Sequence, residues 1–183
     1  MDKKKIDKKS NFWSNLFKIP SDKSEIINLL TSIPLFKDLS PKDLEILLHI
    51  MHNRVYSAGE FIFYQGDPGI ALYIVHEGEV VLETVQDKKA AHIVARYKKG
   101  DFFGELAMLE NEVRFASAIA VGEAKLAVIF KPDLDEYVEK YPKKGIRILR
   151  GMSQIFAERL RTLNQEFVAV YNNNIKANEP EVK

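Results

Sequence analysis

The chain has 183 residues, of which 46% are hydrophobic, so it can bury one core with a terminal extension, and we expect a single domain. Its 27 basic and 26 acidic residues leave a formal net charge of +1, which gives no electrostatic reason to bind nucleic acid. The sequence has no cysteine, no apolar run of membrane-spanning length and no secretory leader after its lysine-rich start. These features exclude a disulfide framework and a thiolate metal site, and they predict a cytoplasmic protein.

The first 20 residues combine six lysines with a group of large apolar side chains, which are Phe12, Trp13, Leu16 and Phe17. If this stretch is helical, these side chains fall on one face, as in segments that lie on a membrane surface. One hypothesis is therefore weak peripheral contact with the inner face of the membrane, and the alternative is a disordered tail or a helix that docks on the domain or on a partner. We assign residues 1–20 as an extension, 21–175 as the domain and 176–183 as a tail.

Two helices are predicted before the middle of the chain. Ser21 or Asp22 can cap the first, whose apolar residues are Ile26, Ile27, Leu29 and Leu30. Ser40 followed by Pro41 is a cap with proline in the first helical position, so a second helix is expected from Pro41 to about His52.

From Asn53 to Phe130 the pattern changes to runs of four to eight residues rich in Val, Ile, Tyr and Phe. Glycines divide these runs, at Gly59, Gly66, Gly69, Gly78, Gly100 and Gly122. This pattern predicts an all-β sandwich or roll. After it, the stretch starting Pro132-Asp-Leu-Asp is expected to cap and begin a helix, and Pro142 is expected to break that helix before a long final one.

The final helix carries an apolar stripe with a seven-residue repeat. One line of the repeat is Leu149, Phe156, Leu163 and Val170, and the other contains Leu160 and Phe167 but is interrupted by Ser153 and Asn174. Because a small β-domain cannot cover so long a stripe, its distal half is predicted to pack against a second copy of the chain. The alternative is that the helix folds back on the β-domain.

The segment from Gly100 to Ser117 combines the chemistry of an anion site with that of a diol site. Gly104 allows a tight turn, and the backbone N–H groups that follow it can face a phosphate. The carboxylate of Glu105 can accept hydrogens from hydroxyl groups, and the guanidinium of Arg114 matches two phosphate oxygens. These residues predict a nucleotide site, with an internal ion pair between Glu105 and Arg114 as the alternative.

This segment resembles the phosphate-binding cassette of cyclic-nucleotide-binding domains, as in protein kinase A regulatory subunits and Crp-type bacterial regulators. The matching residues are Phe103-Gly-Glu-Leu-Ala-Met, Arg114 nine positions after Glu105, and Ala116. Upstream, the stretches that begin at Gly59 and Leu72 also resemble the strand and turn pattern of the family. The resemblance extends over roughly residues 31 to 165. It implies a mainly β fold with flanking helices, in which a jelly-roll type β-roll contains one short cassette helix.

The resemblance also implies a ligand, cyclic AMP or cyclic GMP, without a separate cofactor or metal. Glu105 would hold the ribose 2′-hydroxyl, Arg114 would pair with the cyclic phosphate, and the N–H groups of Glu105, Leu106 and Ala116 would complete the anion site. In the family the last helix often closes over the base, where Thr162 or Asn164 would lie in this chain. The candidate ligand-binding residues are Phe103, Gly104, Glu105, Leu106, Ala107, Arg114, Phe115, Ala116, Ser117 and Asn164.

Two features of the segment depart from the family pattern. Phe115 stands where nucleotide-responsive members usually carry a small or hydroxylated residue. Its ring could stack on a purine, block the pocket or point into the core. Glu110 and Glu112 would also be unfavourable beside an anion if they point inward.

These features predict a non-catalytic sensor, in which a ligand at the cassette moves the last helix and so acts on a second copy or on another protein. The alternative is a degenerate member that binds no nucleotide and serves as an interaction module. We expect no enzyme activity, since Ser117 lacks a nucleophile motif, and no metal, since the four histidines lack ligand spacing, at His49, His52, His76 and His92. Crp-type regulators continue into a helix-turn-helix domain after the long helix, and because this chain does not, we expect no DNA binding.

Overall fold

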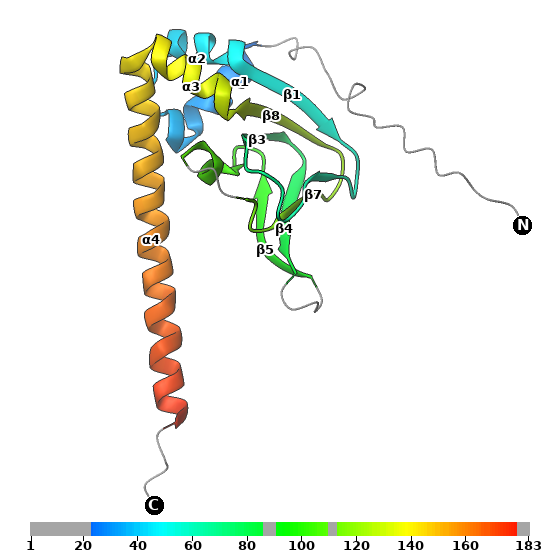
Figure 1. Ribbon diagram of the computed structural model, residues 1–183, viewed down its shortest axis with the longest axis vertical. Helices are drawn as coiled ribbons and strands as arrows, with labels where there is room; N and C mark the ends of the chain where they lie inside the picture. Colours follow the sequence, from blue (N-terminus) through cyan, green and yellow to red (C-terminus); the bar gives the residue numbers. More distant parts are fainter. Residues whose placement is uncertain (1–22, 86–90, 110–112, 179–183) are drawn as a thin grey trace, which may run out of the picture.

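The computed structural model describes residues 23–85, 91–109 and 113–178, with side chains as far as residue 172 (Figure 1). Eight strands form two antiparallel sheets, ordered β1-β8-β3-β6 and β2-β7-β4-β5. The strands are β1 (Met51–Tyr56), β2 (Phe61–Phe63), β3 (Ala71–Glu77), β4 (Glu79–Thr84), β5 (His92–Lys98), β6 (Phe102–Phe103), β7 (Ser117–Ala120) and β8 (Ala124–Phe130). The helices are α1 (Lys23–Ser32), η2 (Pro34–Phe36), α2 (Pro41–Leu47), η3 (Leu48–Ile50), η4 (Glu105–Met108), α3 (Lys131–Lys140) and α4 (Pro142–Asn178).

Strand β3 is buried on both faces, which explains its continuous apolar sequence. Tyr73 and Val75 point into the core between the two sheets, together with Leu126 of β8. Leu72 and Ile74 point the other way, into a second core under the helices. The predicted β-roll with flanking helices is therefore confirmed, and one sheet is covered by helices at one end of the molecule (Figure 1).

The second predicted helix is correct in its start and wrong in its end. The side chain of Ser40 accepts a hydrogen bond from the Asp43 backbone N–H, and the Asp43 carboxylate accepts one from Ser40, so a capping box begins α2 at Pro41. The helix ends at Leu47, and Met51 and His52 already belong to β1, paired with β8. Pairing with a central strand outweighs the weak helical preference of these residues.

Helix α3 starts without the predicted side-chain cap. Its N-cap residue is Phe130, and Pro132 lies in its first turn. Asp133, which the sequence placed in the capping stretch, instead accepts a hydrogen bond from His52 of β1 at 3.0 Å. The predicted break at Pro142 is confirmed, because α3 ends at Lys140 and α4 begins at Pro142.

Helix α4 has 37 residues, or about 55 Å, and only its first half packs against the rest of the chain. Gly151 lies so close to η2 that an added Cβ would be 2.5 Å from the carbonyl oxygen of Leu35. Ile148, Met152 and Ile155 are buried, whereas every described side chain from Leu160 onward is exposed. The distal half therefore projects from the β-roll instead of folding back on it (Figure 1). None of the described helices is both long and apolar enough to cross a membrane.

Candidate functional site

The site begins at a tight turn between β6 and η4. Gly104 adopts the left-handed conformation, with φ of 77°. A Cβ at this position would lie 2.8 Å from Nη1 of Arg114 and 3.0 Å from the carbonyl oxygen of Ala71. Glycine is thus needed both for the backbone conformation and for the close approach of Arg114.

The guanidinium of Arg114 is buried beneath this turn, with 7% of the residue exposed. Nη2 donates to the carbonyl oxygen of Ala71 at 2.7 Å, and Nη1 donates to that of Gly104 at 3.3 Å. Its Cζ also lies 4.3 Å from the centre of the Phe63 ring, a cation–π contact. Among the described residues Arg114 forms no ion pair, and its buried Nε has no hydrogen-bond partner.

Burial lowers the pKa of Arg114, and the nearby Tyr73 hydroxyl and Glu105 carboxylate oppose this shift. Two carbonyl oxygens and an aromatic ring compensate only part of the cost of burying a full positive charge. The arrangement therefore favours an anion as a further partner for Arg114.

Glu105 is also buried, with 5% of the residue exposed, and its partner comes from α4. Its Oε1 accepts a hydrogen bond from Nη1 of Arg159, whose guanidinium lies 5.6 Å from the centre of the Phe102 ring. The internal ion pair considered from the sequence, between Glu105 and Arg114, is not among the ion pairs of the described residues. Instead, Glu105 connects the cassette to the last helix.

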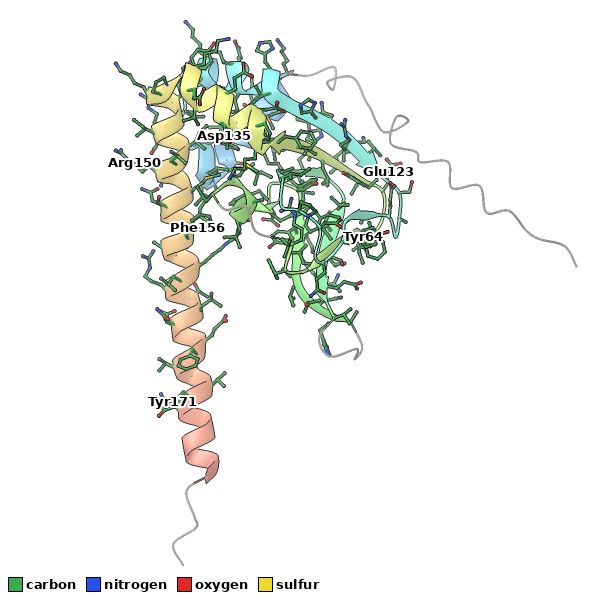
Figure 2. All side chains as sticks on the ribbon, in the orientation of Figure 1. Tyr64, Glu123, Asp135, Arg150, Phe156 and Tyr171 are labelled. Carbon is green, nitrogen blue, oxygen red and sulfur yellow. The ribbon has the colours of Figure 1, made fainter. Side chains whose placement is uncertain are left out.

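The guanidinium of Arg114 and the carboxylate of Glu105 both face one cavity of about 640 Å³ between the β-roll and α4, a volume typical of small-molecule sites. Burial raises the pKa of Tyr97, a further wall residue. Figure 2 shows Phe156, another wall residue, where α4 passes the β-roll. The full wall consists of Phe63, Gly69, Leu82, Tyr97, Gly104, Glu105, Leu106, Ala107, Val113, Arg114, Phe115, Ala116, Phe156, Arg159, Leu160 and Leu163.

Seven of the ten candidate residues from the sequence lie on this wall, namely Gly104, Glu105, Leu106, Ala107, Arg114, Phe115 and Ala116. The other three lie elsewhere. Phe103 is fully buried and stacks on Tyr73 with ring centres 5.2 Å apart. The hydroxyl of Ser117 accepts a hydrogen bond from the Gln65 N–H at 2.9 Å, and Asn164 is exposed on α4 beside the wall residue Leu163.

The sequence did not identify the wall residues contributed by distant elements. Phe63, Leu82 and Tyr97 belong to different strands, and only the fold brings them together. Phe156, Leu160 and Leu163 did appear in the heptad stripe, whose distal half was predicted to pack against a second copy, with folding back on the β-domain as the alternative. Arg159 had no sequence signal, because a lysine or arginine on a helix is ordinarily solvated.

Some sequence-based predictions lie outside the described residues, namely the lysine-rich extension at residues 1–20, the helix cap at Ser21 or Asp22, and the two acidic positions Glu110 and Glu112. In the part of the chain that the structure describes, no group of three or more His, Cys, Asp or Glu side chains is placed to hold a metal ion.

A β-roll with a buried arginine, a buried carboxylate and a helix across one cavity defines a ligand-binding domain. Comparison with known proteins identifies its family, since residues 53–141 match the model of the cyclic nucleotide-binding domain. Residues 53–141 therefore belong to the cyclic nucleotide-binding domain family, as the cassette residues predicted.

The chain is similar to the cyclic AMP receptor protein of Thermus thermophilus, with 33% identity over 133 residues, which are 73% of this chain and 60% of that protein. The crystal structure of the Thermus thermophilus catabolite activator protein aligns with a TM-score of 0.68 and 32% identity, covering 75% of this chain and 63% of that one. The regulatory domain of Toxoplasma gondii PKA, co-crystallised with cAMP, aligns with a TM-score of 0.60 and 29% identity, covering 66% of this chain and 46% of that one. The chain thus spans less than two thirds of each of these relatives.

Proposed function

We propose that the cavity binds a cyclic nucleotide, cyclic AMP or cyclic GMP, and that the protein is a non-catalytic sensor. The observation that carries this proposal is the buried guanidinium of Arg114, which has no described counter-anion and shares a cavity with the buried carboxylate of Glu105. The names of the relatives support the same ligand class, as a cyclic AMP receptor and a PKA regulatory domain crystallised with cAMP.

In this proposal Arg114 pairs with the cyclic phosphate through the N–H groups that its two carbonyl contacts leave free. The backbone N–H groups of Glu105, Leu106 and Ala116 add further donors to the phosphate. The carboxylate of Glu105 accepts a hydrogen bond from the ribose 2′-hydroxyl, since an ionised carboxylate has several acceptor positions and Arg159 contacts one of its oxygens.

The output of the sensor is a change in the position of α4. The first turns of α4 are fixed to the helical layer, whereas Arg159 attaches the middle of the helix to Glu105. A ligand that hydrogen-bonds to Glu105 alters this ion pair, and it contacts Leu160 and Leu163 of the same helix. The ligand shifts α4 only to the extent that it binds one helix position more tightly than the other.

The partner that responds to this change is a second copy of the chain. Beyond the cavity wall, the distal half of α4 exposes Phe167 and Val170, which belong to the heptad stripe. Pairing of two such helices buries an apolar surface that a single chain leaves in water. The proposed assembly is therefore a homodimer through α4.

The alternative of an interaction module that binds no nucleotide is less favoured. It required a protein carboxylate to satisfy Arg114, and Glu105 was the expected partner. In the structure Glu105 pairs with Arg159, and the cavity beside Arg114 is open.

The decisive experiment is calorimetric titration of the purified protein with cyclic AMP and cyclic GMP, repeated on Arg114→Ala. We expect binding to the wild type and a loss of about 2–5 kcal/mol in the variant, the usual cost of removing one partner of a buried charged contact. Arg150→Ala is the matched control, because Arg150 is exposed on α4 and lies off the cavity wall (Figure 2). Equal binding by the wild type and Arg114→Ala would refute the assigned role.

A further inference from the structure

The sheet formed by β2, β7, β4 and β5 carries an apolar row on its outer face. Phe61 of β2 pairs with Ile119 of β7, and Ile119 pairs in turn with Val81 of β4. Their strand neighbours Ala118 and Leu82 belong to the core between the two sheets. Because side chains alternate along a strand, Phe61, Ile119 and Val81 lie together on the opposite face of the sheet.

An exposed aromatic pair stands at one end of this row. Tyr64 is 55% exposed, and its ring stacks on that of Phe61 with centres 4.4 Å apart. We call Phe61, Tyr64, Ile119 and Val81 the outer apolar patch. None of these side chains belongs to the described wall of the cavity, so the proposed nucleotide does not cover them.

Carboxylates border the outer apolar patch. Glu79 and Glu83 stand two positions before and after Val81 on β4, so they point to the same outer face. Glu79 pairs with Arg96 at 2.9 Å, whereas neither Glu83 nor the exposed Glu123 forms an ion pair with another described residue. Figure 2 shows Tyr64 and Glu123 on the side of the β-roll that faces away from α4. The surface therefore suits a partner that is both cationic and aromatic.

The first 20 residues of the same chain have this composition. They contain six lysines against two aspartates. Their large apolar side chains are Phe12, Trp13, Leu16 and Phe17. Lysines complement the carboxylates of the border, and aromatic side chains gain free energy when they cover other exposed rings.

The start of α1 brings this segment to the correct end of the β-roll. Glu25, in the first turn of α1, lies 3.7 Å from His76 of β3 and 3.0 Å from Lys99. His76 is two positions before Gly78, where the chain passes from β3 in one sheet to β4 in the other. The chain that precedes Lys23 therefore begins beside the turn that leads to the outer face.

The segment is also long enough to reach the outer apolar patch. Packed sheets lie about 10 Å apart, and a sheet of four strands is about 15 Å wide. Phe17 and Phe12 stand six and eleven positions before Lys23. An extended chain of these lengths spans about 20 Å and about 36 Å, which brackets the path around the end of the roll.

We propose that residues 12–17 bind the outer apolar patch of their own chain, with the flanking lysines facing Glu79, Glu83 and Glu123. The contact covers the exposed ring pair and ties the start of α1 to the far sheet. It uses the same apolar side chains that would enter a membrane surface, so the two contacts exclude one another. The inference does not depend on the proposed nucleotide.

The chain contains a single tryptophan, Trp13, so the fluorescence of the intact protein reports where this segment lies. We expect Trp13 to emit at shorter wavelength, and to be quenched less by acrylamide, than in the urea-unfolded chain. Emission equal to that of the unfolded chain would overturn the inference. A shift that appears only with vesicles of phosphatidylserine and phosphatidylcholine would overturn it in favour of a membrane, and a shift lost on dilution in favour of a second copy.

An aromatic variant tests whether Trp13 contacts this patch. Tyr64→Ser is expected to weaken the contact by about tenfold, the scale of one lost aromatic partner, and so to move the emission toward that of the unfolded chain. Tyr171→Ser is the matched control, because Tyr171 is 57% exposed and also stacks on a phenylalanine, but lies on α4 (Figure 2). Equal emission by the two variants would overturn the inference.

A charge variant tests the border independently of the rings. Glu123→Lys is expected to move the Trp13 emission in the same direction as Tyr64→Ser, because it repels the lysines of the segment, and added salt should weaken the wild-type contact. Glu139→Lys makes the same change at an exposed position of α3, in the helical layer, and should emit like the wild type. No difference between the two charge variants would contradict the proposed role of the carboxylates.

Discussion

Arg159 on α4 forms an ion pair with Glu105, the buried carboxylate next to the phosphate-binding turn. The two residues are 54 positions apart, and one belongs to the β-roll while the other belongs to the helix that projects from it. Since Glu105 is also the proposed acceptor for the ribose, the ligand and the helix share one carboxylate. In the proposed function this carboxylate links the ligand to α4.

Removal of Arg159 is predicted to destabilise the protein. Arg159→Ala leaves a buried carboxylate without its charged partner, and we expect the free energy of unfolding to fall by about 1–3 kcal/mol. Arg159 itself is partly exposed, which keeps the loss below that of a fully buried pair. Urea denaturation measures the change.

A double-mutant cycle with Glu105→Gln isolates this pair from other effects of the substitution. We expect a coupling of about 0.5–3 kcal/mol between the two positions. Additive effects, with no coupling, would show that the ion pair does not stabilise the contact of α4 with the cassette.

Substitution of Gly104 is predicted to disturb both the backbone and Arg114. Gly104→Ala places a methyl group 2.8 Å from Nη1 of Arg114, so the guanidinium has to move and nucleotide binding should be lost or greatly weakened. Gly59→Ala is the matched control, since Gly59 also has a positive φ, of 75°, but has open space around it.

Both alanine variants carry the left-handed strain of about 1–2 kcal/mol. Thermal unfolding reports this shared cost, and calorimetry with cyclic AMP reports the effect on the site. Binding by Gly104→Ala that matched Gly59→Ala would contradict the importance of the close contact with Arg114.

The cassette was predictable from sequence because its chemistry is local. Gly104, Glu105 and Arg114 lie within eleven positions, and a tight glycine turn limits where their groups can point. The β-roll was predictable for a similar reason, since short apolar runs between glycines are a local pattern. The end of α2 could not be predicted from the sequence, because the pairing of Met51 with Ile129 of β8 depends on a strand far along the chain.

The wall contributed by α4 shows what a helical pattern cannot decide. The heptad stripe identified Phe156, Leu160 and Leu163 as one apolar face, but the sequence does not say what that face contacts. In the structure all three face the cavity, so this part of the stripe serves the site. The packing of the first turns of α4 against the rest of the fold determines which face of the helix is turned toward the cavity.

Acidification is predicted to loosen the attachment of α4 to the helical layer. Asp43 of α2 contacts Lys144 at 3.0 Å and Arg147 at 3.3 Å, both on α4. Burial raises the pKa of Asp43, but hydrogen bonds from Lys144 and Ser40 outweigh it, so the pKa lies below its usual value. A carboxylate with a lowered folded-state pKa stabilises the fold above the unfolded-state pKa, and this stabilisation is lost as the pH falls through the folded-state value.

We therefore expect the difference in stability between the wild type and Asp43→Asn to be full at neutral pH and to shrink below about pH 4, where the carboxyl group of unfolded chains titrates. Thermal unfolding across this pH range measures it. Asp135→Asn is a control on the neighbouring helix α3, where the carboxylate is exposed and forms none of these contacts (Figure 2). A difference that does not change with pH would show that the charge of Asp43 is not what stabilises this contact.

A single charge on the distal half of α4 is predicted to abolish the proposed dimer. Phe167 is 69% exposed, and its only described ring contact is with Tyr171 on the same helix, with centres 6.3 Å apart. Phe167→Glu should leave the fold of the monomer unchanged, because no other element packs on this side chain. In a paired helix it would bury a carboxylate in an apolar seam, so we expect the dimer dissociation constant to rise at least about a hundredfold.

Ala169→Glu adds the same charge two residues further on, off the stripe, and should dimerise like the wild type. Sedimentation equilibrium of the three proteins distinguishes the outcomes, since a monomeric wild type, or equal association by Phe167→Glu, would contradict pairing through this face.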